Sequence, residues 1–588
     1  MKKFLALTLA LLFTFLCIPF YTHTANADAQ IWDGSIADGF NGGDGSKENP
    51  YEIATGAQLA LLAKETISAP IGEFAYQGVY FKQTQDIILN DVSNIADWKN
   101  QPPKNEWASI GICVYTEEDS FEKPFAGNFD GNGFTISGMY VNDDSTQGGL
   151  FGIIDCGSLK NITLADSLVV SGAESWLYTA GIVADVRNSR VENCINKADV
   201  SSVHFAGGVV GQSRFGSTIL NCSNYGNITA VGTDGYSSAA AGGVIMSGSE
   251  TTVENCNNYG IVESSGRASG IMTIASGDVI IKSCNNYGTI SGHNFVGGIC
   301  AESDLLKIAF CSNEANISAK IQYAGGIVGQ SNRTEIYMCQ NSGDVTAQSY
   351  VGGIAGKGSA AFDDGDSVIS RCKNSGNVVA TESYVGGICG VCIANTAPFT
   401  ISDCYNTGEV TMQANDGTEG GIVALLQQDN TEARVTVINC YNVGKTSSVY
   451  TSISAHDYYC SIKECYFLAE EEPEEEYFGT ALNEEQMRDS ASFVGFDFEK
   501  VWIMDETTEY PYPELRPDNS MPSPKPDMGD VNFDGTVNAA DAVLVLRHCV
   551  ELITLDEQQL EVSDLIEDGI VNTGDAVAIL RKCVGLDY

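Results

Sequence analysis

Positively charged side chains are few in this chain of 588 residues. Lys and Arg number 31 against 76 Asp and Glu, which gives a formal net charge of −45. A face basic enough to bind nucleic acid is therefore excluded, and binding to anionic membranes is disfavoured. The acidity fits a soluble extracellular protein with affinity for cations, but it does not identify a partner.

Long apolar runs are also missing, with one exception at the N-terminus. The segment 5–20 is apolar, follows Met1-Lys-Lys-Phe4 and precedes two A-x-A sites within 25–29. A basic start, a short apolar stretch and A-x-A sites are typical of a secretory signal peptide, and the stretch is short for a membrane span. We therefore expect a signal peptide at 1–29, no membrane span in the mature protein and an extracellular location.

Catalytic signatures are scarce as well. His204, His293 and His456 lie far apart, and no Ser/His/Asp or Cys/His arrangement and no HExxH metalloprotease motif stands out. The densest acidic site among the repeats described below, 363–366, reads more simply as a solvated turn. Cleavage of a glycosidic bond by acid–base chemistry needs two carboxylates at a set separation, and no such pair stands out. Catalysis stays open, with a non-catalytic protein favoured.

Cysteines are numerous, and their spacing marks a repeat. From about Gly148 to Cys465, a Gly-Gly-aliphatic motif alternates with a Cys-x-Asn-x-Gly motif. Successive motif cysteines from Cys194 to Cys440 are 27 to 36 residues apart. The full cysteine motif begins at Cys222, Cys256, Cys284, Cys339, Cys372, Cys404 and Cys440. A period in this range signals a repeat architecture.

The pattern of each repeat predicts short strands, because aliphatic residues alternate with polar ones and the turn-forming residues Gly, Asn and Asp separate these stretches. No repeat offers a long stripe of period 3.6, so helical solenoids are excluded. Such units suit the turns of a parallel β-solenoid, in which each turn completes its core by stacking on the next. Ten or more turns, at about 4.8 Å each, predict a rod roughly 50–60 Å long.

Stacking turns the repeated positions into columns. We expect the motif cysteines to face inward, mostly as free thiols, because parallel side chains on neighbouring rungs suit a disulfide poorly. Zinc is disfavoured, since each turn supplies one motif cysteine and almost no histidine. The asparagines are expected to form an amide ladder, and the paired glycines to mark corners where a Cβ would clash. Tyr225, Tyr259 and Tyr287 share one repeat position, where an aromatic ladder is favoured and a sugar-binding strip is the alternative.

These repeats resemble the GLUG motif of large bacterial secreted and surface proteins. The resemblance extends upstream, through 45–53 and 125–138, to a segment like the one that opens such β-helices. It implies a mainly β chain built on a right-handed parallel β-helix, and we expect a short capping helix at 57–66. The expected divisions are an N-terminal cap with the first turns at 30–145, repeats at 146–468, a C-terminal cap at 469–515 and a proline-rich linker at 516–528.

The C-terminal segment holds two stretches spaced like calcium loops. In the first, oxygen-bearing side chains fall at positions 1, 3, 5, 9 and 12 counted from Asp530, and Gly535 stands at position 6, where such a loop turns sharply. A helix-like run follows at once, and a similar loop and helix return about 34 residues later. We expect two Ca²⁺ sites, formed by Asp530, Asn532, Asp534, Thr536, Asn538 and Asp541 and by Asp564, Asp568, Ile570, Asn572 and Asp575.

Two tandem loop–helix units with Asp at position 12 resemble the type I dockerin, over 529–588. Members of that family are small all-α modules that fold with calcium. They attach an extracellular protein to a cohesin domain on a scaffold or cell surface. Position 3 of the second loop is Ile566, which has no side-chain oxygen, so the second site is expected to be weaker. The resemblance implies cohesin contacts from Ala539, Ala540, Arg547, Thr573, Gly574 and Arg581.

The favoured hypothesis is a secreted, non-catalytic β-helix attached by its dockerin to a cohesin-bearing scaffold, as in a cellulosome-like complex, or to a cell surface. The rod would bind carbohydrate or another surface there. The first alternative is a polysaccharide lyase or glycoside hydrolase of the same complex. It rests on the fact that dockerins usually occur on polysaccharide-degrading enzymes, and not on a catalytic site found in this sequence. The second alternative is an adhesin-like surface protein.

Overall fold

The computed structural model divides into two compact units, Met1–Pro513 and Glu514–Tyr588. It describes residues 30–115, 120–142, 147–172, 177–232, 239–360, 366–428, 434–447, 452–457, 460–469, 478–504, 510–517, 529, 531, 537, 539–550, 555, 557–566 and 571–583. The expected signal peptide and most of the expected linker fall outside these residues, so both remain predictions.

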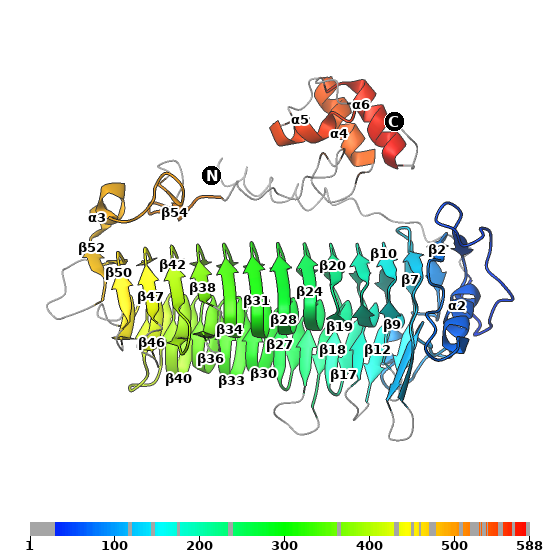
Figure 1. Cartoon of the computed structure of the whole chain (residues 1–588), viewed down its shortest axis with the longest axis horizontal. Helices are drawn as coiled ribbons and strands as arrows, with labels where there is room; N and C mark the ends of the chain where they lie inside the picture. Colours follow the sequence, from blue (N-terminus) through cyan, green and yellow to red (C-terminus); the bar gives the residue numbers. More distant parts are fainter. Residues whose placement is uncertain are drawn as a thin grey trace, which may run out of the picture. The chain divides into compact units, whose positions relative to one another are not determined.

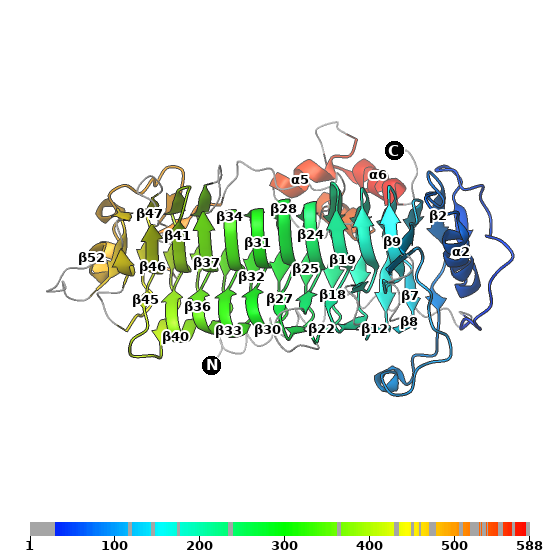
Figure 2. The ribbon, with the colours of Figure 1, turned by 60° about the horizontal axis from the view of Figure 1, so that its bottom comes forward.

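The first unit is a stack of short parallel strands (Figure 1). Within the described residues, these strands form three large sheets of 21, 14 and 15 strands. Two successive rungs follow the sheets in order, as β28 (Met272–Lys282), β29 (Asn285–Asn286) and β30 (Ile290–Gly297), then β31 (Cys300–Ala309), β32 (Ser312–Asn313) and β33 (Ile317–Gly325). Each strand pairs in parallel with its counterpart one rung on. The unit is therefore a parallel β-helix, as the repeats predict, and Figure 2 shows its first and third sheets as adjacent faces.

Alternation of buried and outward side chains builds the core of each rung. In β31, for example, Leu306 and Ile308 are buried while Lys307 faces outward. The motif cysteines form an inward column, each at most 1% exposed, at Cys194, Cys222, Cys256, Cys284, Cys311, Cys339, Cys372, Cys404, Cys440 and Cys465. Every cysteine of the described residues is a free thiol. The predicted column of buried, unbridged cysteines is therefore present.

A left-handed residue precedes each cysteine of the column and turns the chain from the first sheet into the second. From Asn193 to Glu464, its φ lies between 45° and 60° at every rung. Asparagine is among the few residues with a side chain that visit this region readily, and it fills the position at Asn193, Asn221, Asn255 and Asn439. At other rungs bulkier residues, such as Phe310, adopt the same φ, because the neighbouring rungs fix the path of the backbone.

The motif asparagines form a second buried column beside the cysteines. The side-chain amide of each donates to Oδ1 of the asparagine on the next rung, in an unbroken series from Asn196 to Asn442 at 2.7–2.9 Å. Each amide also donates to the carbonyl two residues further along its own turn, as Asn258 does to Gly260. The predicted amide ladder is confirmed, and it satisfies turn carbonyls that would otherwise be buried without a donor.

The paired glycines stand at close backbone approaches, the first glycine within its own rung and the second against the next rung. A Cβ added at Gly242 would lie 1.9 Å from the carbonyl oxygen of Ile245, and one at Gly243 would lie 2.2 Å from the carbonyl oxygen of Gly270. Both distances are far below van der Waals contact and involve backbone atoms that cannot move aside. The predicted corners are confirmed.

The N-terminal end of the β-helix carries the expected helix. It is α2 (Gly56–Ser68), and Thr55 begins it by accepting a hydrogen bond from the backbone N–H of Gln58. Leu59 and Leu62 of this helix are fully buried in the main core. The helix thus covers apolar residues of the first turns.

The C-terminal block contains a short helix followed by a two-residue strand with an aromatic side chain, β53 (Trp502–Ile503). Its helix α3 (Glu484–Met487) has four residues, because Asp489 begins a new turn by accepting a hydrogen bond from the backbone N–H of Ala491. Its aromatic side chains pack on the outer face of the last rungs, where the Trp502 ring lies 5.8 Å from that of Tyr441. The limits 469–515 remain a proposal.

The second unit is small and helical. Its described helices are α4 (Ala539–Cys549), α5 (Glu557–Ser563) and α6 (Thr573–Cys583). They surround an apolar core whose most buried members include Val531, Val545 and Ile579.

Candidate functional sites

The histidines and most of the acidic residues singled out by sequence do not gather into one site. His204 and His293 are 6% and 7% exposed, and His293 Nδ1 hydrogen bonds to the side-chain amide of Asn294 at 3.2 Å. The His456 side chain and the pair at 363–364 lie outside the described residues. Among the residues that the structure describes, no three His, Cys, Asp or Glu side chains are placed to hold a metal ion.

Asp366 does line a groove on the first sheet. The groove has a volume of about 1070 Å³, and its lining includes Asp278, Leu305, Arg333, Asp366 and Thr396, which come from five successive rungs. Its charged side chains have both signs, because Lys307 and Glu335 join the lining as well. The groove is a binding candidate that spacing in the sequence did not reveal.

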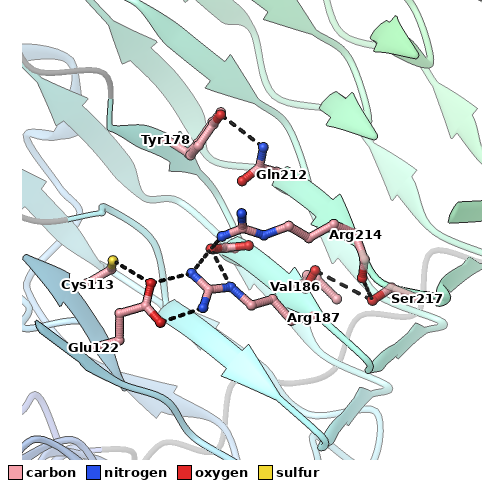
Figure 3. A network of polar contacts seen from close by, with 9 residues as sticks. Cys113, Glu122, Tyr178, Val186, Arg187, Gln212, Arg214 and Ser217 are labelled. Carbon is pink, nitrogen blue, oxygen red and sulfur yellow. Dashed lines mark hydrogen bonds and ion pairs between the residues drawn. The ribbon is translucent and has the colours of Figure 1, made fainter. Parts of the chain in front are cut away.

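A network of ion pairs holds a hairpin against the outside of the β-helix (Figure 3). The hairpin is β4 (Ile112–Tyr115) and β5 (Ser120–Lys123), and the supporting strand is β14 (Val183–Arg187). The guanidinium group of Arg187 donates to both carboxylate oxygens of Glu122, at 2.5 and 2.7 Å, and to Oδ2 of Asp185, at 2.8 and 3.0 Å. Arg187 therefore links the hairpin to a rung of the β-helix.

The charges of this network balance, with two arginines and two carboxylates. Asp185 is fully buried, and Arg214 donates to it as well, at 2.8 Å. Burial opposes the charge of Arg187, but the hydrogen bonds and charges of Glu122 and Asp185 outweigh it and raise the pKa of its guanidinium group. Both carboxylates thus pair with arginines, which favours a structural role over acid–base catalysis.

The tyrosines at the shared repeat position form a stacked ladder. The ring centroids of Tyr225 and Tyr259 are 4.5 Å apart, and those of Tyr259 and Tyr287 are 4.9 Å apart, with the planes inclined by only 8° and 10°. Both faces of the Tyr259 ring and the facing sides of the Tyr225 and Tyr287 rings are therefore covered, although the three side chains remain 40–48% exposed. Sugars stack on ring faces, so this geometry supports the ladder interpretation.

A second aromatic ladder was not expected from the sequence. Phe295, Tyr323, Tyr350 and Tyr384 stack in series with centroids 4.9–5.3 Å apart, and all four have left-handed φ values of 54–62°. The guanidinium group of Arg267 covers the free face of Phe295 at 5.1 Å. The signal in the sequence was an aromatic residue two positions before each of these Gly-Gly motifs.

The predicted calcium loops end at two buried carboxylates in the second unit. Asp541 and Asp575 lie in the first turns of α4 and α6, and both are 0% exposed. Oδ1 of Asp541 accepts a hydrogen bond from the backbone N–H of Val531 at 2.9 Å. Asp575 accepts from the backbone N–H groups of Ile566, at 3.1 Å, and Asn572, at 2.9 Å. Each aspartate thus ties the start of its loop to the start of the following helix.

The chemistry of these residues fits a hard cation. A carboxylate is costly to bury unless it is paired, hydrogen-bonded or bound to a metal, and Ca²⁺ prefers carboxylate and carbonyl oxygens. Asp564 and Asn572 are also described, whereas the other expected ligands, Asp530, Asn532, Asp534, Thr536, Asn538, Asp568 and Ile570, lie outside the described residues. The ligand set as a whole therefore remains a proposal.

Comparison with protein families decides the nature of this unit. Residues 528–582 match the family model of the Dockerin type I domain. This part of the chain is a type I dockerin. Type I dockerins bind calcium and dock to cohesins, which agrees with the loop spacing and with the buried Asp541 and Asp575.

Relatives of the chain are similar to it over limited stretches. A "Putative Gly-rich membrane protein" of Evansella cellulosilytica is 33% identical over 162 residues, which are 27% of this chain and 16% of the relative. Halomucin of Haloquadratum walsbyi is 25% identical over 193 residues, 32% of this chain and 2% of the relative. The chain thus spans only a small part of these relatives. In the described residues, no helix combines the length and the apolar character needed to cross a membrane.

One solved structure is also similar. It is described as a "putative immunoglobulin A1 protease from Bacteroides ovatus", and the match covers 81% of this chain and 95% of that one, with 16% identity and a TM-score of 0.21.

The dockerin presents two related exposed faces. Arg547 and Arg581 are exposed, as the family resemblance implies, and Thr573 is exposed beside the half-buried Gly574. The side chains of Ala539 and Ala540 lie outside the described residues, although their backbone opens α4.

Exposed aliphatic side chains extend both faces. Val543 and Leu546 on α4 are 49% and 39% exposed, and Val577 and Leu580 on α6 are 55% and 41% exposed. The two pairs are 34 residues apart, as are the two loops. The expected cohesin contacts omitted these four residues, although the duplication of the sequence could have revealed them.

Proposed function

We propose that this protein is a secreted β-helix that docks through calcium-dependent binding of its dockerin to a cohesin. The cohesin would belong to an extracellular scaffold of a cellulosome-like complex or to the cell surface. One observation carries the proposal: two buried aspartates close duplicated loops, and each is followed by a helix with an exposed aliphatic and arginine face. The β-helix would serve there as a binding module for carbohydrate in polysaccharide breakdown.

Two calcium sites are proposed for the dockerin. The first uses oxygens of Asp530, Asn532, Asp534, Thr536, Asn538 and Asp541, and the second uses those of Asp564, Asp568, Ile570, Asn572 and Asp575. The second site should be weaker, because Ile566 supplies no side-chain oxygen at position 3 and its side chain is 49% exposed.

The proposed docking surface combines the residues implied by the family with the exposed aliphatic pairs. Ala539, Ala540, Arg547, Thr573, Gly574 and Arg581 are the implied contacts. Val543, Leu546, Val577 and Leu580 would add apolar area at the centre of each face, where interfaces gain most of their energy.

Binding of the full chain to a panel of immobilised type I cohesins tests the docking role. We expect binding in calcium and its loss in a chelator. Because the two faces repeat each other, Leu546→Asp and Leu580→Asp are combined, and this double variant should lose binding. Val494→Asp, at an exposed position of the β-helix unit, is the matched control and should bind normally. Equal binding in calcium and in chelator would contradict the proposal.

An enzyme is the second candidate function, because Glu335 and Asp366 both line the groove of the first sheet. A lyase or hydrolase at this place would release unsaturated or reducing ends from pectins, xylans or starches. Release by the full chain, abolished in Asp366→Asn, would favour catalysis over simple binding. An adhesin-like role has no residue-level support in the described part of the chain.

A further inference from the structure

The groove of the first sheet arises where the corner of the β-helix changes. In β28, β31 and β34 (Val328–Tyr337), one left-handed residue bends a continuous strand, namely Gly277, Leu305 or Arg333 with φ of 69°, 60° and 49°. In the next two rungs the strand is divided in two, as β37 (Ala355–Ala360) with β38 (Ser367–Ser370) and β41 (Cys389–Ala394) with β42 (Phe399–Ser402). Asp366, Thr396 and Pro398, which precede β38 and β42, line the groove at this step.

The floor of the groove combines aliphatic and ionic side chains. Ile280 and Leu305 are 45% and 37% exposed, so their apolar side chains are open to a ligand. Lys307 and Glu335 form an ion pair at 3.1 Å, and their side chains are 65% and 56% exposed. Both could therefore exchange a solvent contact for one with a ligand at little cost.

Arg333 is held in place at the same floor. It donates from Nε and Nη2 to the two carboxylate oxygens of Asp304, at 3.0 and 2.6 Å. A bidentate pair of this kind fixes the orientation of the guanidinium plane. The groove therefore has at least one charged group whose position is set before any ligand arrives.

The dimensions suit an extended polymer. Five rungs at about 4.8 Å spacing give a length of roughly 20 Å along the axis of the stack. Along this direction each rung offers side chains at equivalent positions, as Lys307 and Glu335 do in paired strands. A ligand with a regular repeat of polar groups would meet them in register.

The sheet itself argues against a peptide. An extended peptide usually binds by pairing its backbone with the open edge of a sheet. Here β31 is paired on both sides, with β28 and with β34, so the floor offers no open edge. A peptide therefore could not pair its backbone with the sheet, whereas the hydroxyl groups of a sugar can accept from Lys307 and Arg333 and donate to Glu335.

The charges of the groove favour a neutral polysaccharide over an anionic one. Three carboxylates in the groove, those of Asp278, Glu335 and Asp366, face two cations, Lys307 and Arg333. The whole chain carries a formal charge of −45. A polyanion would be repelled by this field and would find no surplus of positive charge in the groove.

We infer that this groove binds a neutral, linear polysaccharide lying along the axis of the β-helix. The inference rests on the proposed binding role of the β-helix, to which it assigns a site and a ligand class. The sugar hydroxyls bond to the ionic side chains of the floor, and the C–H faces of the sugar rings lie on Ile280 and Leu305.

Calorimetry with soluble oligosaccharides of glucose, xylose and mannose tests the assignment in the full chain. The double variant Lys307→Gln, Glu335→Gln removes both ionic groups without changing the net charge. Thr396→Arg places a bulky side chain at the wall of the groove. We expect each to weaken binding about tenfold or more, through lost hydrogen bonds in the first and steric exclusion in the second.

Two controls separate the groove from other surfaces. The double variant Glu409→Gln, Lys445→Gln removes another exposed ion pair, at 3.8 Å, whose two residues do not line the groove. Tyr259→Ser removes the middle ring of the exposed tyrosine ladder. Both should bind like the unmodified chain, and thermal unfolding should show that all four variants remain folded.

Three other outcomes would contradict the assigned site, the ligand class or the binding role of the β-helix. Binding that only Tyr259→Ser weakens would place the site on the ladder and refute the groove, while the binding role stands. Binding of polyuronates or peptides in place of neutral sugars, with sensitivity to the groove variants, would refute the ligand class. A chain that binds cohesin but no polysaccharide would refute the binding role of the β-helix and the groove together.

Discussion

The side-chain amide of Asn258 donates to Oδ1 of Asn286 on the next rung over 2.9 Å. The same amide donates to the carbonyl of Gly260, and Oδ1 of Asn258 accepts from Asn224 on the preceding rung. One buried side chain therefore satisfies groups on three consecutive rungs. Since a buried polar group left without a partner is costly, the ladder fixes the register of the whole stack.

Replacement of Asn258 by Ala should destabilise the β-helix strongly. It leaves the Asn224 amide, the Gly260 carbonyl and Oδ1 of Asn286 without one partner each, which should cost about 3–9 kcal/mol of unfolding free energy. Thermal and urea unfolding of the full chain measure this loss.

The neighbouring Asn257 provides the control. Its side chain is half-buried and accepts one hydrogen bond, from Asn285 at 3.0 Å, so Asn257→Ala should cost about 0.5–1.5 kcal/mol. Equal losses in the two variants would show that the inner ladder has no special role.

The asparagine and cysteine columns could be predicted from the sequence because their causes are local. A residue repeated every 27 to 36 positions must occupy one place on every rung, and burial of Cys together with turn chemistry of Asn decides which way each faces. The ladder from Phe295 to Tyr384 obeys the same rule, because each of its residues stands two positions before a Gly-Gly motif, so it could have been predicted in the same way.

Features that depend on contacts distant in sequence could not be predicted in this way. Arg187 meets Glu122 from 65 residues away, and the hairpin that carries Glu122 belongs to no repeat. The groove depends on a change of corner between β34 and β38, which appears in the sequence only as a longer spacing near Asp366. In the dockerin, the duplication of the sequence relates Val577 and Leu580 to Val543 and Leu546, but the exposure of their side chains is visible only in the structure.

Buried thiols should make the β-helix less stable in alkali. Burial raises the pKa of Cys194, Cys222, Cys256, Cys284 and Cys311 well above the ordinary value. The unfolded chain loses these protons near about pH 8.5 while the folded chain keeps them. Stability is therefore fully present below that pH and falls above it, by about 1.4 kcal/mol per thiol and pH unit.

Urea unfolding between neutral pH and pH 10 measures this decline. Replacement of Cys256 and Cys284 by Ala should make the decline shallower, even though each change also lowers stability at neutral pH through a cavity. A slope that is the same in the double variant would exclude thiol ionisation as the cause. The exposed Cys583 offers the control, because its replacement should change the slope far less.

Loss of the Arg187 side-chain charge should release the hairpin from the β-helix. Arg187→Met leaves the fully buried Asp185 with one arginine in place of two and leaves Glu122 without its bidentate partner, at a cost of about 3–5 kcal/mol. Hydrogen exchange should rise in β4 and β5 before it rises in the rungs. Arg190→Met is the control, because Arg190 pairs with the nearby Glu192, at 2.8 Å, and its side chain is 47% exposed. Unchanged exchange in the hairpin of Arg187→Met would contradict the role assigned to the network.

A carboxylate at position 566 should strengthen the second calcium site. Ile566 is half-exposed, so Asp fits there without a cavity, and its backbone N–H already donates to Asp575, which brings the new oxygen close to the proposed ligand set. Calcium affinity rises with the number and charge of the ligands, and we expect Ile566→Asp to tighten the weaker site about tenfold. Calorimetric titration of the full chain with Ca²⁺ measures the affinity of both sites.

The control is Val577→Asp, which adds the same charge at another exposed position of the same unit and should tighten calcium binding far less. If both variants tightened it equally, the gain would come from the general field of the domain and not from a missing ligand, and the proposed weakness at Ile566 would be wrong.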